Sequence, residues 1–300
     1  MIASCGEAVL DLLPSGARAL GGSPFNVALG VARLGGESAF LGALPEGEQA
    51  APFLEALVSA GVSLAHLQRV PWPLLTAEVR VHDGVTDYRF SPDDSADRHL
   101  APSGLAGVAA LHVGSLVLAR SPAAEAVARA ATAFPGFLSL DPNARPFAIG
   151  DLPAWRSRLR RVAARADLVK LSGEDAAALA PGEAPAALAA ALLASGCGAV
   201  VLTDGARGAR LHLRSGDLAV PAYPAAPGGD AVGAGDSFMA GLLVALGDAG
   251  LLLAGSLGGL APGELAGALR FAAAAASLTC AARGAAAPGR AAVEERLGRA

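Results

Sequence analysis

Residues 230–238 read Asp-Ala-Val-Gly-Ala-Gly-Asp-Ser-Phe, and the pattern of the following residues, Met239–Leu246, favours a helix. The small residues Gly233, Ala234 and Gly235 allow the backbone to approach a ligand closely, and we expect their N–H groups to point toward the helix start. A helix N-terminus combines free amides with the positive end of the helix dipole. This turn therefore predicts a binding site for an anion.

Asp236 lies at the same helix start. A carboxylate there would stand beside a bound phosphate group, where a hydroxyl nucleophile has to approach, so its natural role is general base in phosphoryl transfer. The amides would stabilise charge on the transferred group. The alternative is that Asp236 only caps the helix. A dinucleotide fingerprint is excluded because Phe238 stands at the position of its third glycine, and the chain has no Walker-type loop with Lys-Ser or Lys-Thr.

A second unusual turn opens with Gly21-Gly22-Ser23-Pro24-Phe25-Asn26. Ser23 is a good N-cap, Pro24 is a good first helical residue, and Gly35 is expected to end the helix. The glycine pair and Asn26 would then lie at a helix start, where backbone donors and an amide side chain can hold a polar ligand. The alternative is an ordinary junction between a loop and a helix.

Outward from these two turns, short apolar runs alternate with helical patterns along most of the chain. This rhythm predicts the α/β class, with a mostly parallel sheet and helices on both faces. Ligands bind such sheets outside the carboxyl ends of the strands. The predicted strands are Ile2–Ser4, Ala39–Gly42, Leu111–Gly114, Phe137–Leu140, Leu168–Leu171 and Ala199–Thr203, and the predicted helices include Pro52–Ala60, Pro122–Ala133 and Glu174–Leu179.

One segment breaks this rhythm and predicts an antiparallel hairpin. Residues 76–82 and 85–90 both alternate, and Asp83-Gly84 between them is a strong two-residue turn signal. The register that this turn sets pairs Ala77 with Phe90, Glu78 with Arg89, and Arg80 with Asp87. The last two are opposite-charge pairs, which supports this register.

The hairpin needs further strands, because a lone hairpin is marginal in water. We expect it to join strands around Ala8–Leu13 and Ala17–Leu20 in a small sheet beside the main one. No linker sets this sheet apart, and the chain has no internal repeat. The sequence therefore predicts one domain over residues 1–300, with a lid formed within it by about residues 8–20 and 74–100.

Charge and composition argue against several classes of protein. The net charge is −4 with both signs spread along the chain, and no basic block suggests a nucleic-acid surface. The three cysteines have no metal-ligand spacing and fit a reducing cytoplasm. No cationic start precedes an apolar stretch, so we expect no signal peptide. The uncharged run Ala184–Thr203 is long enough to span a bilayer, but Pro185 and the turn at Ser195-Gly196 favour a short helix and a buried strand. We expect a cytoplasmic protein without a nucleic-acid or membrane partner.

The stretch Asp230–Asp236 resembles the C-terminal signature of the ribokinase-like carbohydrate kinases. The glycine-pair turn and its alanine-rich helix resemble the first signature of the same family. The resemblance implies a ribokinase-like fold that binds ATP, Mg²⁺ and a sugar. It implies that Asp236 is the catalytic base, that Gly233, Ala234 and Gly235 form an anion hole, and that Asp11, Gly22 and Asn26 bind sugar hydroxyls. The family usually has threonine at the position of Ala231. Alanine cannot make the hydroxyl contact of that threonine, and the change also concerns the K⁺ binding that the resemblance implies near this loop.

The nucleotide side is implied by two further segments. Ser172 and Asp175 stand where the family has Asn-x-x-Glu, which organises magnesium and phosphates, and a hydroxyl and a carboxylate still suit magnesium-bound water. The alternative is that Ser172 is an N-cap followed by an acidic first turn. The segment 203–208 resembles the family's Thr-x-Gly-x-x-Gly, which implies nucleotide contacts from Thr203, Gly205 and Gly208.

Several segments are similar to the fructokinase branch, among them Asp87-Tyr-Arg-Phe90, Ser95-Ala-Asp-Arg98 and Asp141-Pro-Asn-Ala-Arg-Pro146. Asn143 and Arg145 lie just beyond the carboxyl end of a predicted strand, where a site belongs, and we expect them to bind substrate, since the planar guanidinium of arginine suits anionic oxygens. Arg89 would contact substrate only if it pointed into the cleft, since the hairpin register already gives it Glu78 as a partner.

We therefore expect transfer of the γ-phosphate of ATP to a primary hydroxyl, with D-fructose as the leading acceptor. The alternatives are the same chemistry on 2-keto-3-deoxygluconate, ribose or a nucleoside. A rival from another class is a regulator that binds sugar or nucleotide without turnover. The lid would exclude water from the reaction, and an exposed apolar face on it is a candidate homodimer contact.

Overall fold

The computed structural model describes residues 1–82, 85–225, 229–282 and 284–299. Its main sheet has the strand order β14-β13-β12-β11-β10-β9-β1-β4. The strands from β12 to β4 run parallel, and β13 and β14 complete one edge in antiparallel pairing. The bounds are β1 Ile2–Cys5, β4 Ser38–Leu41, β9 Ala110–Gly114, β10 Phe137–Asp141, β11 Leu168–Ser172, β12 Ala199–Thr203, β13 Ala209–Leu213 and β14 Gly216–Val220.

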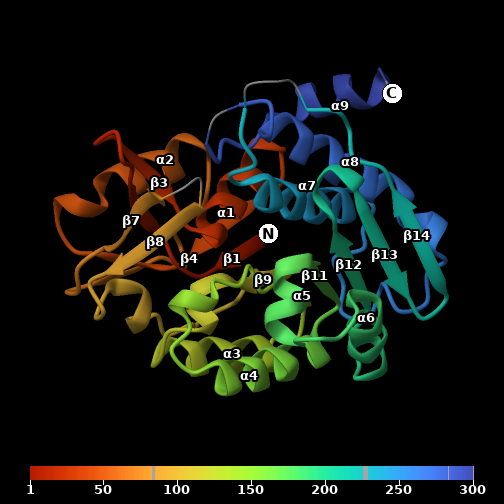
Figure 1. Ribbon diagram of the computed structural model, residues 1–300, viewed down its shortest axis with the longest axis horizontal. Coiled ribbons are helices and arrows are strands. Elements are labelled where there is room, and N and C mark those ends of the chain that lie inside the picture. The colour runs from red at the N-terminus through yellow and green to blue at the C-terminus, as the bar shows by residue number, and fades with distance from the viewer. Residues whose placement is uncertain (83–84, 226–228, 283, 300) are drawn as a thin grey trace.

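Each predicted parallel strand is present within one or two residues of its expected bounds, whereas β13 and β14 were not predicted. Helices cover both faces of the sheet (Figure 1). On one face lie α1 Ser23–Arg33, α7 Ala234–Asp248, α8 Ala266–Thr279 and α9 Arg290–Gly298, and on the other lie α3 Ala123–Ala133, α4 Leu152–Arg165, α5 Gly173–Leu179 and α6 Pro185–Ala194. The predicted mostly parallel α/β architecture is thus confirmed.

The core divides according to the alternation of side chains along the strands. In β1, Ile2 belongs to the cluster under α1, α7 and α8, whereas Ala3 and Cys5 belong to the cluster under α3, α4 and α6. A smaller cluster joins Phe25 of α1 and Phe40 of β4 to α2, Ala51–Ser59. Among the described residues, no helix has both the length and the apolar character that a membrane span requires.

A separate small sheet has the order β3-β2-β7-β8, with β2 Val9–Leu12, β3 Arg18–Gly21, β7 Leu75–His82 and β8 Val85–Ser91. The predicted hairpin register is confirmed residue for residue, including Glu78 opposite Arg89. The predicted Asp83-Gly84 turn lies outside the described residues. One face of this sheet, carrying Val9 and Leu75, packs on Leu116 of the main body. A third pairing joins β5 Ala43–Pro45 to β6 Gln68–Val70.

Two helix starts meet above the main sheet because α1 and α7 pack side by side (Figure 1). The contact is close at Gly30, where an added Cβ would lie 2.7 Å from the Cβ of Ala240. The N-cap of α1 is Gly22 and not Ser23, which is the first residue of the helix. The predicted helix end is confirmed, because Gly35 follows the C-cap with a φ of 86°.

We predict that Gly30→Ala destabilises the fold, because the new methyl group forces α1 and α7 apart. Overpacking of this kind costs roughly 1–3 kcal/mol, which exceeds the gain of up to about 1 kcal/mol from replacing glycine in a helix. Gly267→Ala is the matched control, since Gly267 lies in α8 with open space around it. Urea unfolding of both variants checks this, and equal stabilities would contradict the close contact.

Candidate active site

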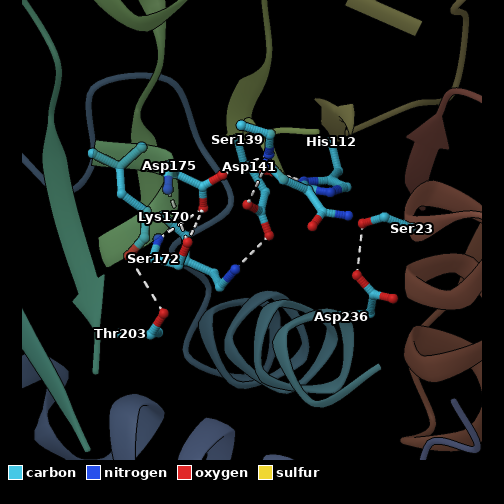
Figure 2. Close-up of polar contacts among 12 residues, drawn as sticks. Ser23, His112, Ser139, Asp141, Lys170, Ser172, Asp175, Thr203 and Asp236 are labelled. Atoms are coloured by element: carbon cyan, nitrogen blue, oxygen red, sulfur yellow. Dashed lines mark hydrogen bonds and ion pairs between the residues drawn. The ribbon is translucent and has the colours of Figure 1, made fainter. Parts of the chain in front are cut away.

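Asp236 is the third residue of α7, and its buried carboxylate is held from α1 (Figure 2). The Ser23 hydroxyl donates a hydrogen bond of 2.6 Å to Oδ1, and the Asn26 amide donates one of 2.8 Å to Oδ2. The N-cap of α7 is Gly233, with no side-chain cap bond. The alternative that Asp236 only caps its helix is therefore wrong, since its carboxylate receives side chains from another helix.

The start of α7 leaves backbone donors ahead of its hydrogen-bond ladder. The first bond of the ladder runs from the Ser237 amide to the Gly233 carbonyl, at 2.9 Å. The amides of Gly235 and Asp236 precede it, as in any helix start. The Ala234 amide differs, because it donates to the Ala231 carbonyl at 3.2 Å. The geometry fits an anion bound between the amides of Gly235 and Asp236. A role of Ala234 in that anion site stays a prediction.

The electrostatics of Asp236 suit a base. Burial raises the pKa of its carboxyl above the ordinary value, while the hydrogen bonds from Ser23 and Asn26 and the positive charges of Lys170 and Arg145 act in the opposite direction. A carboxylate with a raised pKa accepts a proton more readily and remains ionised when hydrogen-bond donors hold it. The two α1 side chains therefore favour the charged form of a basic group at the helix start.

The turn before α1 has a backbone that only glycine fits. Gly22 has a φ of 105°, and an added Cβ would lie 2.4 Å from the Glu7 carbonyl oxygen. Gly21 faces Asp11 in the same way, with 2.6 Å between an added Cβ and the carboxylate. The Asp11 carboxylate therefore lies next to this turn, and burial raises its pKa to about 6.

Asp11 and Arg89 come from the small sheet but from opposite faces of it. Asp11 pairs with Ala77, which pairs with Phe90, on the face that packs against the main body. Arg89 is exposed and pairs with Glu78 on the other face. The expectation that Arg89 contacts substrate is thus not supported within this chain, because side chains alternate between the faces of a strand.

A buried ion pair that the sequence interpretation missed joins the last residue of β10 to the middle of β11 (Figure 2). The Lys170 ammonium donates to Asp141 Oδ2 at 2.6 Å, and both side chains are almost fully buried. Burial, together with the charges of Asp175 and Asp236, raises the pKa of Asp141 to about 6 despite the attraction of Lys170. The available signal was that Lys170 is the only lysine in the chain.

The loop after β10 carries Asn143 and Arg145 toward this pair. Asn143 has a φ of 39° and donates its backbone N–H to Asp141 Oδ1 at 3.2 Å. The half-buried Arg145 donates to the Ala144 carbonyl at 3.0 Å. Its positive charge is near enough to lower the pKa of Asp236. The structure thus brings Arg145 into the same site as the base.

Asp175 joins the ends of two strands. Its Oδ1 accepts the Ala144 amide at 2.6 Å, and its Oδ2 accepts the amide and hydroxyl of Ser172 at 2.8 and 2.7 Å. Ser172 is the N-cap of α5 in a full capping box, as the structural alternative expected. Among the described residues, no three His, Cys, Asp or Glu side chains are grouped to hold a metal ion. A contact of Asp175 with Mg²⁺ through water stays a prediction.

The turn after β12 has its own glycine requirement. Gly208 has a φ of 98°, and an added Cβ would lie 2.1 Å from the Val220 carbonyl oxygen. Gly205 also has a positive φ, of 52°, but is exposed with open space around it. Thr203 ends β12 and donates its hydroxyl to the Leu171 carbonyl at 3.4 Å. These residues lie at the same sheet edge as Asp141, Lys170 and Ser172.

This arrangement, with a base at a helix start and polar side chains along the carboxyl edge of a parallel sheet, agrees with known proteins. Residues 4–291 match the model of the pfkB family carbohydrate kinases. The chain belongs to this family of carbohydrate kinases, and its resemblance to the ribokinase-like signatures is confirmed.

Individual relatives are fructokinases. The chain is 34% identical to a fructokinase of Rhizobium leguminosarum bv. trifolii over 82% of this chain and 79% of the relative. It is 36% identical to one of Klebsiella pneumoniae over 80% and 82%. Its structure is similar to that of Xylella fastidiosa fructokinase with bound ATP, with a TM-score of 0.89 and 27% identity over 99% and 98% of the two chains. It is also similar to a Vibrio cholerae O395 fructokinase double mutant in its fructose, ADP and potassium ion bound form, with a TM-score of 0.84 and 28% identity over 99% and 97%.

We predict that Ser23→Ala moves the acid limb of the kcat/KM profile to higher pH. Loss of a hydrogen bond to the charged form of Asp236 raises the pKa of that base further, so activity is lost earlier as the pH falls. A hydrogen bond to a charged group is worth roughly 1.5–3 kcal/mol, which corresponds to a shift of at least about one pH unit.

Ser277→Ala is the matched control, because the buried Ser277 hydroxyl bonds a carbonyl within α8 and does not contact Asp236. The pH profiles of sugar phosphorylation by both variants test the assignment. An acid limb in Ser23→Ala that coincides with wild type would show that the hydroxyl does not tune the base.

Proposed function

We propose that this chain is an ATP-dependent fructokinase that transfers the γ-phosphate of ATP to a primary hydroxyl of D-fructose. The observation that carries the proposal is the Asp236 carboxylate, held by Ser23 and Asn26 at the start of α7 beside the first-turn amides of Gly235 and Asp236. The choice of fructose is supported by the fructokinases among the relatives and by the Vibrio cholerae structure that binds fructose, ADP and potassium.

The reaction follows from these groups. The fructose hydroxyl approaches Asp236, gives its proton to the carboxylate and attacks the γ-phosphorus, while the bond to ADP breaks. The first-turn amides and the dipole of α7 stabilise charge on the transferred group. Asp11, Gly22, Asn26, Asn143 and Arg145 surround the acceptor side. Asn26 would then bind sugar while it also holds the base.

ATP would lie along the ends of β11 and β12, against Ser172, Asp175, Thr203, Gly205 and Gly208. Mg²⁺ prefers oxygen ligands and keeps several waters, and the carboxylate oxygens of Asp175 already accept three hydrogen bonds. We therefore infer that the ion is held chiefly by the phosphates of ATP and reaches Asp175 through water. It would supply charge neutralisation to the phosphates.

A monovalent cation such as K⁺ would bind near the loop before α7. Support comes from the contact of this loop with the segment after α8, where the Asp230 amide donates to the Ala282 carbonyl at 3.1 Å and the Asp230 carboxylate accepts the Gly284 amide at 3.1 Å. Ala231 offers no hydroxyl to such an ion, so backbone carbonyls would be its ligands.

The small sheet would act as a lid over the sugar. Phe147, which follows Arg145 in the loop after β10, stacks on both Tyr88 and Phe90 of β8 with ring centroids 6.0 Å apart. This contact links lid position to the loop that carries Arg145. A closed lid excludes water, which suppresses ATP hydrolysis.

The outer face of the lid carries an apolar strip on β2 and β3 beside the charged pair of Glu78 and Arg89, and we propose that a second copy of the chain covers this strip. Leu10, Leu12 and Leu20 line a groove there together with Pro52 and Phe53. Leu12→Asp is then expected to convert a cytoplasmic homodimer into monomers, because it would bury a charge without a partner. Sedimentation equilibrium measures this, and a wild-type protein that is monomeric at high concentration would contradict the interface.

We expect ADP release with ATP, Mg²⁺ and D-fructose, and a drop of roughly 10²–10⁴-fold in kcat for Asp236→Asn, since general base catalysis is worth about that much. Asp248→Asn is the matched control, because Asp248 is exposed at the far end of the same helix. The panel also includes 2-keto-3-deoxygluconate, ribose and adenosine, each with and without K⁺.

Turnover on another member of the panel would retain the mechanism and remove the fructose assignment. Arg145 near the base would suit a carboxylate-bearing acceptor, although Arg89 on the outer face of the lid would not add to it. A protein that binds sugar or nucleotide but turns over none of them would be a regulator instead.

A further inference from the structure

Lys170 is an unusual residue in this chain. It is the only lysine among 23 Lys and Arg residues, and it is 4% exposed in the middle of the sheet. An ion pair buried in this way is weak support for stability, because well-packed neutral residues are often as stable. Fold stability therefore gives no reason for an ammonium group here, and a role in the site is the better explanation.

The ammonium lies directly beneath the start of α7. A Cβ added at Gly235 would stand 3.3 Å from Lys170 Nζ and 3.9 Å from its Cε. Gly235 lies within the helix and is not among the residues with positive φ, so its backbone does not demand glycine. Glycine at this position instead leaves the space between the Lys170 ammonium and the first-turn amides open.

The hydrogen bonds of Lys170 are incomplete without a ligand. An ammonium has three N–H donors, and within the described part of the chain its hydrogen-bond partner is Asp141. Asp141 is itself fixed by the Asn143 amide, so it orients the ammonium from the β10 side. Two donors therefore remain for oxygen atoms that enter above Asp141.

The charge balance of the site also calls for this cation. Asp141, Asp175 and Asp236 all lie close enough to act on Lys170 electrostatically. A polyphosphate that enters among three carboxylates meets repulsion, which Lys170 and Arg145 oppose. Arg145 lies on the loop after β10, whereas Lys170 extends from the central strand β11 and is held by its hydrogen bond to Asp141 (Figure 2).

We propose that Lys170 is a catalytic residue whose ammonium donates hydrogen bonds to the oxygens of the phosphoryl group in transfer, with Asp141 as its positioning residue. The proposal rests on the proposed phosphoryl transfer at Asp236. In the step, the bond from the γ-phosphorus to ADP breaks, the bond to the sugar oxygen forms, and the sugar proton moves to Asp236. Lys170 keeps its three protons throughout and supplies charge alone.

The kinetic test uses Lys170→Met and the double variant Lys170→Met/Asp141→Asn, in which asparagine keeps an acceptor for the Asn143 amide. Lys170→Met is expected to lower kcat by roughly 10²–10³-fold, as for loss of one donor to transition-state charge, with the KM for sugar changed less than about threefold. Its unfolding temperature should also fall, because the buried Asp141 carboxylate loses its cationic partner.

The double variant separates catalysis from stability. Because it removes both charges of the pair, it is expected to regain most of the unfolding temperature and none of the lost kcat. A double variant that regains kcat together with stability would give the pair a purely structural role and overturn the proposal. If the wild-type enzyme itself fails to turn over sugar, the proposed function fails, and the following binding experiment still tests Lys170.

Since Lys170 is the only lysine, labelling the protein with ¹⁵N-lysine gives one side-chain ammonium signal in an NMR spectrum. ADP with Mg²⁺ and aluminium fluoride, a mimic of the phosphoryl group in transfer, is expected to shift this signal, whereas fructose alone leaves it unchanged. A signal that moves with neither addition, while a nucleotide-induced rise in unfolding temperature proves binding, would overturn the contact with the phosphoryl group.

Discussion

The hydrogen bonds from Ser23 and Asn26 to Asp236 are the interaction on which the rest of the site depends. They join groups more than 200 residues apart in the sequence, and they form only because α1 and α7 pack closely at Gly30 and place both helix starts over the same sheet edge. A buried carboxylate without such donors would be protonated or would destabilise the fold. The same two hydrogen bonds therefore offset the cost of burying the Asp236 carboxylate and hold it in place as a base.

The parallel strands and the hairpin could be predicted because each has a strong local signal. Buried apolar runs mark the central strands, which are covered on both faces, and the alternation on either side of Asp83-Gly84 fixes one register. Strand β14 gives no such signal, because most of its residues are exposed and its partner β13 follows a glycine turn directly. An edge strand of this kind forms because it pairs with the neighbouring strand, and that pairing leaves no local signal in the sequence.

The site could be predicted only where its chemistry lies within one motif. Gly233–Asp236 form one turn, so their roles follow from local sequence. Ser23 was assigned as a cap because nothing local reveals a carboxylate on another helix, and the pair of Asp141 with Lys170 depends on the register of two strands. The hairpin register left the direction of Arg89 open, because local alternation does not tell which face of the small sheet turns toward the core; the structure turns the face with Val9 and Leu75 inward and Arg89 outward.

The capping box at α5 has a mechanical consequence. The Asp175 carboxylate closes that box and also grips the Ala144 amide in the loop after β10. The loop after β10, which would meet the sugar, and the start of α5, which would meet ATP, are thus both hydrogen-bonded to one carboxylate. The distance between the two stretches is therefore set by the hydrogen bonds of a single side chain.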